Sequence, residues 1–228
     1  ADPAIGCAGP KHLNVDGSLQ PSMGAFPTLV DDFLELTGAD RIEPVKAWLA
    51  KRSPYWGAHD EYQIVDWVNG ACLLVRGNAF ESVGGFDERF FAYAEEVDLC
   101  RRLQMEGWKI AYCPESTIVH KQGASLNGEP DVRLELRYWG HLQLYYRYRS
   151  RTEYCLLRTV VAFIATVRMS ALAIFAVSRS IGCEPPRGLV TFIADDNSAE
   201  ADYLAWRGWV RIVQFALMGV SNTSPRHP

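Results

Sequence analysis

The chain has 228 residues, 48% of them hydrophobic, so it is long enough to bury the core of one or two domains. Its formal net charge of −4 argues against nucleic acid as a partner. The charge is uneven, however, because residues 137–180 contain seven arginines and a single acidic residue, Glu153. This segment carries about +6 and the remainder about −10, an asymmetry that needs an explanation.

In chain order, the first part of the sequence predicts alternating strands and short helices. Strands are expected at 5–9, 64–68, 71–75, 109–113 and 117–119, with short helices at 29–36 and 78–83. Irregular chain is expected around Pro44 and Pro54. The six cysteines form no CxxC pair, and some lie in apolar runs, as Cys72 does. We therefore expect buried, reduced thiols, as in a cytosolic protein.

The strongest helix pattern covers residues 95–106. Leu99 and Leu103 have the i,i+4 spacing, and Gly107 stands where a helix often ends. From residue 131 onward the pattern changes to long helices at 131–150, 153–179 and 202–219.

Three carboxylates, Glu95, Glu96 and Asp98, gather at the start of the 95–106 helix. They favour the helix dipole, and Asp98 can pair with Arg102 at i,i+4, so a purely structural role is one interpretation. The other is a general base that takes a proton from a sugar hydroxyl. His120, at the end of an apolar strand, is either structural or a metal ligand that neighbouring carboxylates complement.

Two longer stretches resemble family 2 glycosyltransferases of the rhamnosyltransferase-like branch. They are Asp66–Arg76 and the motif at 84–102, which reads GGFDERFFAYAEEVDLCRR. The segments around Gly9-Pro10-Lys11, 107–112 and 120–125 are similar to the same branch. The resemblance covers about residues 4–126 and implies an α/β fold, a partial GT-A sandwich, followed by an α-helical tail.

The resemblance also implies a division of the chain and a missing half. Residues 1–128 are expected to be the acceptor-side half of a GT-A domain, and residues 129–228 a helical, arginine-rich tail. The nucleotide-binding half, with its metal-binding Asp-x-Asp motif, is expected upstream of Ala1. The chain is thus expected to be a piece of a longer protein.

Site roles follow from the resemblance residue by residue. Glu96 maps onto the catalytic base, where most relatives have Asp, and Glu95 is the residue that could share this role. His120 maps onto a ligand of the divalent ion, Mg or Mn, that neutralises the departing diphosphate. Lys121 is expected near that diphosphate. The expected acceptor-side residues are Asp66, Trp67, Gly70, Tyr93 and Asp98.

The resemblance implies an inverting transferase that uses a nucleotide-sugar donor, with dTDP-rhamnose as the candidate. The acceptor is expected to be a saccharide or a polyprenyl-linked sugar in cell-envelope polysaccharide synthesis. The tail combines aromatic and basic residues, which favours a cytoplasmic protein attached to an anionic membrane surface, the inner face of the plasma membrane. A soluble helical cap is the alternative for the tail. A spanning helix is disfavoured because Arg168 lies near the middle of the apolar run at 159–178.

Two other functions compete with the transferase. The first is a non-catalytic module that binds acceptor or membrane without turnover. The second is a glycoside hydrolase, which is weaker because hydrolases place two carboxyls across the scissile bond, whereas these acids share one short segment.

Overall fold

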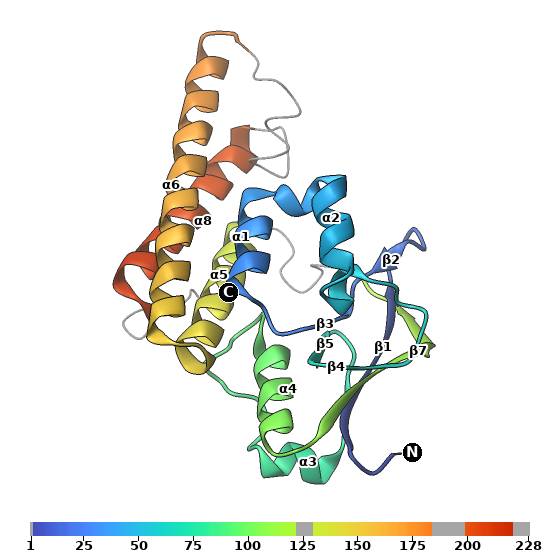
Figure 1. The fold of residues 1–228 in the computed structure, drawn as a ribbon. Coiled ribbons are helices and arrows are strands. Elements are labelled where there is room, and N and C mark those ends of the chain that lie inside the picture. The colour runs from blue at the N-terminus through green and yellow to red at the C-terminus, as the bar shows by residue number, and fades with distance from the viewer. Residues whose placement is uncertain (1, 122–129, 184–198, 221–228) are drawn as a thin grey trace. The chain divides into compact units, whose positions relative to one another are not determined.

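The computed structural model describes residues 2–121, 130–183 and 199–220 and divides the chain into two compact units (Figure 1). The α/β unit comprises Ala1–Thr28 and Ala39–Ala124, and the helical unit comprises Leu29–Gly38 and Ser125–Pro228. A single division was expected at residue 128. In the structure residues 29–38, which include the short helix Leu29–Thr37, group instead with the later helices, so the chain passes between the units more than once.

A five-stranded sheet forms the centre of the α/β unit, in the order β2-β1-β7-β4, with β6 also paired to β1. β1 and β7 are parallel, and the other pairs are antiparallel. A separate two-stranded sheet pairs β3 with β5. The strands are β1 (Ile5–Leu13), β2 (Leu19–Gln20), β3 (Met23–Gly24), β4 (Gln63–Val65), β5 (Trp67–Val68), β6 (Leu74–Val75) and β7 (Lys109–Val119).

The last strand is longer than the sequence predicts. Strands were expected at 109–113 and 117–119, with a break at Pro114, but β7 runs through that proline. Its register against β1 shifts there, because Pro10 lies opposite Cys113 and Lys11 lies opposite Thr117. A bulge tolerates a proline because its residues do not need to donate to the ladder. The pairing with β1 therefore continues as far as Val119.

The helices of the α/β unit are α2 (Glu43–Ala50), α3 (Gly77–Ser82) and α4 (Glu95–Met105), with 3₁₀ turns at Ala39–Arg41 and Pro54–Trp56. α2 corrects the prediction of irregular chain around Pro44. This proline lies in the first helical turn, where its missing N–H leaves no hydrogen bond unmade.

α4 confirms the helix expected at 95–106. Leu99 and Leu103 are fully buried in one core cluster with Val68 and Ile110. Gly107 follows the helix with φ of 88°, a left-handed conformation that glycine adopts readily. The buried leucines hold α4 against the sheet.

The helical unit consists of α1 (Leu29–Thr37), α5 (Pro130–Tyr148), α6 (Arg151–Ser180) and α8 (Ala199–Met218). α6 begins two residues before the predicted start at 153 because Ser150 and Glu153 form a capping box. The Ser150 hydroxyl accepts from the Glu153 N–H at 3.2 Å, and the Glu153 carboxylate accepts from the Ser150 N–H at 3.0 Å.

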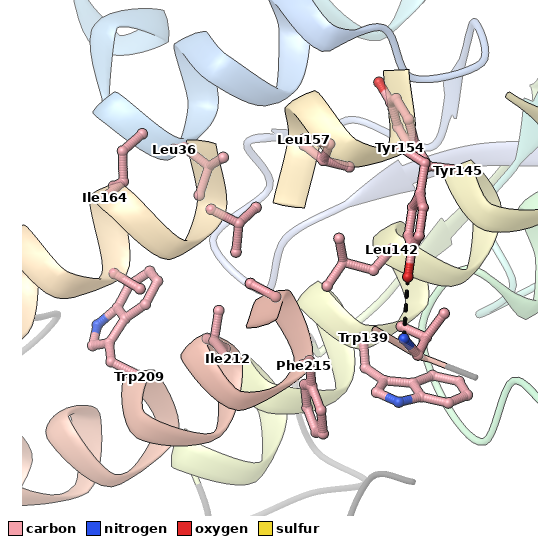
Figure 2. Close-up of a cluster of buried hydrophobic side chains, with 14 of the residues drawn as sticks. Leu36, Trp139, Leu142, Tyr145, Tyr154, Leu157, Ile164, Trp209, Ile212 and Phe215 are labelled. Carbon is pink, nitrogen blue, oxygen red and sulfur yellow. Dashed lines mark hydrogen bonds between the residues drawn. The ribbon is translucent and has the colours of Figure 1, made fainter. Parts of the chain in front are cut away.

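A single apolar cluster holds these helices together (Figure 2). Leu36 of α1, Leu157 of α6 and Phe215 of α8 are among its buried members. Full burial of such side chains stabilises the fold by about 1.5–3 kcal/mol each. The Tyr154 hydroxyl accepts from the Val220 N–H at 3.1 Å (Figure 2), which ties the end of α8 to α6.

The cysteines correct part of the expectation. All six are free, and Cys7 and Cys100 are buried as expected. Cys72, Cys155 and Cys183 are exposed, however. The apolar run around Cys72 misled the prediction, because most of residues 70–74 lie in an exposed turn before the short strand β6.

Candidate active site

The backbone immediately before α4 is strained. Tyr93 and Ala94 have φ angles of 66° and 71°, and they are the only non-glycine residues with positive φ in the described part of the chain. A left-handed conformation costs about 1–2 kcal/mol for each such residue. Strain of this kind, when observed, points to a functional constraint. Here it sets the direction in which Glu95 and Glu96 enter the first helical turn.

The two glutamates lie beside the Asn69–Gly70 turn. A β-carbon at Gly70 would lie 3.4 Å from the Glu96 Cβ and 3.6 Å from the Glu95 Oε1. Gly70 itself is exposed, whereas both glutamates are only partly exposed. The structure therefore brings together three of the predicted site residues, Gly70, Glu95 and Glu96, at a partly open position.

Glu95 has the electrostatics of a functional carboxyl. Burial raises its pKa, because desolvation disfavours the charged form, although the backbone N–H at Glu95 opposes this effect. Its Oε2 atom is buried and has no hydrogen-bond partner within the described residues. A carboxyl in these surroundings can hold or take up a proton closer to neutral pH than an exposed glutamate can.

Asp98, expected at the acceptor, is fully buried. Its Oδ2 accepts from the Arg102 Nε at 2.7 Å, which confirms the i,i+4 pair that the sequence suggested. The Arg102 Nη1 also donates to the Val83 and Gly85 carbonyls, at 2.7 Å and 2.6 Å. Asp98 and Arg102 thus fasten the glycine turn to α4, a turn that needs glycine because Gly84 and Gly85 have φ of 75° and 74°.

Asp66 and Trp67 organise the segment around β3. The Asp66 Oδ2 accepts from the Phe26 N–H at 2.9 Å, and the Trp67 indole N–H donates to the Ala25 carbonyl at 2.8 Å. Gly24 has room for no side chain, because a β-carbon there would lie 2.7 Å from the Trp67 ring. The Asp66 carboxylate and the Trp67 indole N–H therefore both make hydrogen bonds within the protein, and these bonds hold the β3 segment in place.

His120 lies where three strands converge. On β1, His12 pairs with Gln20 of β2 on one side and with Ile118 of β7 on the other. His120, two residues after Ile118, therefore lies close to Gln20. The His120 Nδ1 is 2.7 Å from the Gln20 Oε1, and the His120 N–H donates to the Leu13 carbonyl at 2.9 Å. An amide oxygen only accepts, so Nδ1 donates to Gln20, and in the neutral ring Nε2 presents its lone pair.

A second, buried imidazole stands behind His120. The ring of His12 is fully buried, and its centroid is 5.6 Å from that of His120. Burial, with a smaller contribution from His120, lowers the pKa of His12 to about 4. His12 is therefore neutral at physiological pH, and it adds no positive charge that would oppose a cation at His120.

The fit to a divalent ion is partial. Within residues 2–121, 130–183 and 199–220, no three His, Cys, Asp or Glu side chains are placed to hold a metal. The His120 Nε2 can bind a metal, but the described residues supply no complete set of metal ligands. Lys121 is exposed, and residues 122–125, the rest of the segment that resembles the family, lie outside the described residues.

Sequence reasoning missed Gln20. It is 7% exposed and lies 100 residues from its partner His120, and only strand pairing brings the two together. Sequence spacing carries no signal for such a contact. The Gly24 requirement was missed for the same reason, since it depends on where the Trp67 ring packs.

Comparison with known proteins places the chain among sugar transferases. The family model described as glycosyl transferase family group 2 matches residues 25–216. The chain is 35% identical over 138 residues to an N-acetylglucosaminyl-diphospho-decaprenol L-rhamnosyltransferase of Mycobacterium tuberculosis, covering 58% of this chain and 42% of that protein. It is 42% identical over 57 residues to the rhamnosyltransferase WbbL of Escherichia coli, covering 25% of this chain and 22% of that protein.

A more distant relative is the low-salt glycan biosynthesis hexosyltransferase Agl10 of Haloferax volcanii, 30% identical over 95 residues, which are 42% of this chain and 28% of that protein. The chain thus spans less than half the length of the curated relatives it matches. No solved structure matches the chain.

Proposed function

The chain belongs to glycosyl transferase family group 2, and we propose that it provides the acceptor side of an inverting glycosyltransferase in cell-envelope polysaccharide synthesis. The observation that carries this proposal is the strained Tyr93–Ala94 pair, which turns two partly buried glutamates toward the open Gly70 turn. A helix cap alone needs no such strain. Ala94, at the N-cap position, makes no side-chain hydrogen bond.

The proposed reaction is a single displacement. The acceptor hydroxyl gives its proton to the Glu96 carboxylate as its oxygen bonds to the anomeric carbon. The bond from that carbon to the nucleoside diphosphate breaks, and the diphosphate leaves with the electron pair. A general base typically contributes about 10²–10⁴-fold to the rate. Burial raises the pKa of Glu95, which favours its protonated form more than in an exposed glutamate, and we propose that this carboxyl donates a hydrogen bond to the acceptor beside Glu96.

Asp98 takes a positioning role in this proposal. Through Arg102 it holds the Gly84–Gly85 turn against α4, and this fixes the position of the first helical turn, which carries Glu95 and Glu96. Asp66 and Trp67 shape the β3 segment, and we keep Tyr93 and Gly70 as the residues that border the acceptor.

A divalent ion is part of the proposal, with His120 as the ligand this chain supplies and Asp-x-Asp ligands outside it. When bound, the ion would neutralise the charge that develops on the diphosphate. Gln20 holds the His120 ring by accepting from Nδ1, so that Nε2 stays available. Lys121, next along the chain, is placed to contact the same diphosphate in this proposal.

The relatives' names support the choice of substrates. Two of them transfer rhamnose, and one acts on N-acetylglucosaminyl-diphospho-decaprenol. We propose an activated rhamnose, dTDP-rhamnose, as the donor and a polyprenyl-diphosphate-linked sugar as the acceptor. Such an acceptor remains in the membrane, so the protein would act at the cytoplasmic face.

The test replaces one carboxylate at a time in the intact protein that contains this chain. Transfer of labelled sugar from the nucleotide donor to a polyprenyl-linked acceptor is measured for Glu96→Gln, Glu95→Gln and the control Glu106→Gln. Glu106 is exposed just beyond the end of the same helix, so its loss should leave the rate unchanged.

Glu96→Gln should lower kcat by about 10²–10⁴-fold. Glu95→Gln should lower it less and shift the pH profile. Full turnover in Glu96→Gln would remove Glu96 as the base. Absence of turnover in the unmodified intact protein, with all donors tried, would favour a binding module.

A further inference from the structure

One face of α6 is exposed along the middle of the helix and carries no charge. Between residues 155 and 177 every exposed position holds an apolar residue, an alanine, a cysteine or a hydroxyl residue. The large members, which define the uncharged face, are Leu156, Phe163, Val167, Ile174 and Val177, each more than half exposed. At a rise of 1.5 Å per residue, this stretch extends for about 33 Å. A continuous apolar surface of this length marks a contact site.

The hydroxyl groups on this face need no water. The Thr159 Oγ1 donates to the Cys155 carbonyl at 2.9 Å, Thr166 to Ala162 at 2.7 Å, and Ser170 to Thr166 at 2.9 Å. Each bond returns to the preceding turn of the same helix. In an apolar medium a hydroxyl without such a partner would carry a large desolvation penalty. The face can therefore be desolvated without leaving these hydroxyl groups unpaired.

The two arginines in the middle of α6 are turned toward the protein. Arg158 donates to the Ala216 carbonyl at 2.6 Å. Arg168 donates to the Leu36 carbonyl at 2.8 Å, and its guanidinium lies 5.0 Å from the centre of the Trp209 ring. These contacts explain how a helix with internal arginines can present a face without charge. Arg168, which disfavoured a spanning helix in the sequence, therefore does not lie on the exposed face.

A basic and aromatic corner stands at the N-terminal end of the face. Tyr146 is 53% exposed, Arg151 is exposed, and the Arg147 guanidinium lies 5.4 Å from the centre of the Tyr148 ring. Arginine and tyrosine together are typical of the boundary between lipid headgroups and acyl chains. The corner lies at the N-terminal end of α6, where the Tyr146 ring packs 5.5 Å from that of Tyr154, and it matches anionic lipid in charge.

We propose that α6 lies in the plane of an anionic membrane, with its uncharged face in the outer acyl region and residues 146–151 among the headgroups. This deepens the proposed function, because it brings the protein to a lipid-linked acceptor. Lying flat follows from burial. Leu157, Val161 and Phe175 on the other side pack in the core of the helical unit, so only one side of α6 is available for lipid.

Charge favours lipid over a second copy of the chain as the occupant. Residues 146–151 contain three arginines and no acidic residue, so the same corner of a second copy could not supply the opposing acids. Anionic headgroups can. α6 is also the one helix in the described residues that is long and apolar enough to cross a bilayer, and only 28% of its most apolar window is buried.

The test is flotation of the intact protein that contains this chain with vesicles of phosphatidylcholine, with and without phosphatidylglycerol. The variant carries Phe163→Asp and Ile174→Asp, at positions 68% and 63% exposed. The matched control carries Val15→Asp and Met105→Asp, at positions 73% and 68% exposed in the α/β unit, and so has the same change in charge. Circular dichroism and thermal unfolding compare the folds, and Phe163→Ser with Ile174→Ser replaces the variant if the aspartates disturb folding.

We expect the parent and the control to float, more strongly with phosphatidylglycerol, and the Phe163/Ile174 variant to bind at least about tenfold more weakly. Equal binding of a folded variant overturns the proposal. So does a parent that fails to float and is a dimer that the variant converts to monomer, because the face would then belong to a second copy. Binding needs no turnover. An intact protein that floats but transfers no sugar leaves this inference standing and removes the proposed function.

Discussion

Removal of the Asp98 carboxylate tests whether that residue positions the site or contacts the acceptor. In Asp98→Ala the Arg102 guanidinium, whose side chain is only 16% exposed, keeps its two carbonyl partners but loses its counter-ion. Breaking a buried ion pair by removing one partner costs about 3–5 kcal/mol. Because one side of this pair is partly exposed, we expect the lower end, about 3 kcal/mol.

For a protein of this size, 1 kcal/mol corresponds to about 2–4 °C in Tm. The expected loss is therefore about 6–12 °C, measured by urea and thermal unfolding of the chain. The control is Glu43→Ala, which breaks the exposed Lys46–Glu43 pair, whose nitrogen–oxygen distance is 3.9 Å, and should change stability by less than about 1 kcal/mol.

The result that would refute this reasoning is an Asp98→Ala chain as stable as the parent. If such a chain also raised the KM for acceptor in the intact protein, Asp98 would be an acceptor contact after all. A positioning role predicts the opposite pattern, with lower stability and with Arg102→Lys losing part of it, because lysine cannot reach the carboxylate and both carbonyls together.

Three further predictions concern Gly70, Gln20 and His12. Gly70→Ala should leave stability and turnover nearly unchanged, because its β-carbon would meet only ordinary contacts. Gly70→Val should raise the KM for the acceptor, because the larger side chain crowds the two glutamates. Equal kinetics in both variants would place the acceptor elsewhere. Gln20→Leu should weaken Mn²⁺ binding by the intact protein about 10–100-fold, measured by calorimetry. In nitrogen NMR spectra the His120 ring should then populate both tautomers, and an unchanged tautomer contradicts the role given to Gln20. The folded pKa of His12, about 4, lies below its unfolded value near 6.5, so the unfolded chain binds more protons and stability should fall by up to about 3 kcal/mol as pH drops from about 6.5 to 4. His12→Leu should flatten that acid limb in urea unfolding at several pH values, and a limb as steep as the parent's would assign it to other groups.

The local elements were accessible from sequence because their causes are local. The spacing of Leu99 and Leu103, the acids before them and Gly107 after them predict α4, and the structure has it. Pro44 misled the prediction of α2 because a proline breaks a helix interior but not its first turn. The long apolar repeats of the tail predict the helices of the helical unit in the same way.

The family was also accessible from sequence. The motif at 84–102 indicated it, and the family match over residues 25–216 agrees. The sequence alone could not distinguish a helix cap from an active site at Glu95 and Glu96, because both uses need acids at a helix start. The left-handed Tyr93–Ala94 backbone supports the active-site interpretation that we propose, and a φ angle of alanine or tyrosine has no signature in composition.

What only the tertiary structure decided are the contacts made across long stretches of chain. The pairing of β1 with both β2 and β7 brings Gln20 to His120. Arg158 and Arg168 point inward because carbonyls of other helices accept their hydrogen bonds, so the outer face of α6 is left without charge. The sequence determined which residues could carry chemistry and which helices could form. Their directions depend on partners far away in the chain, and those partners are chosen by packing and hydrogen bonding rather than by spacing.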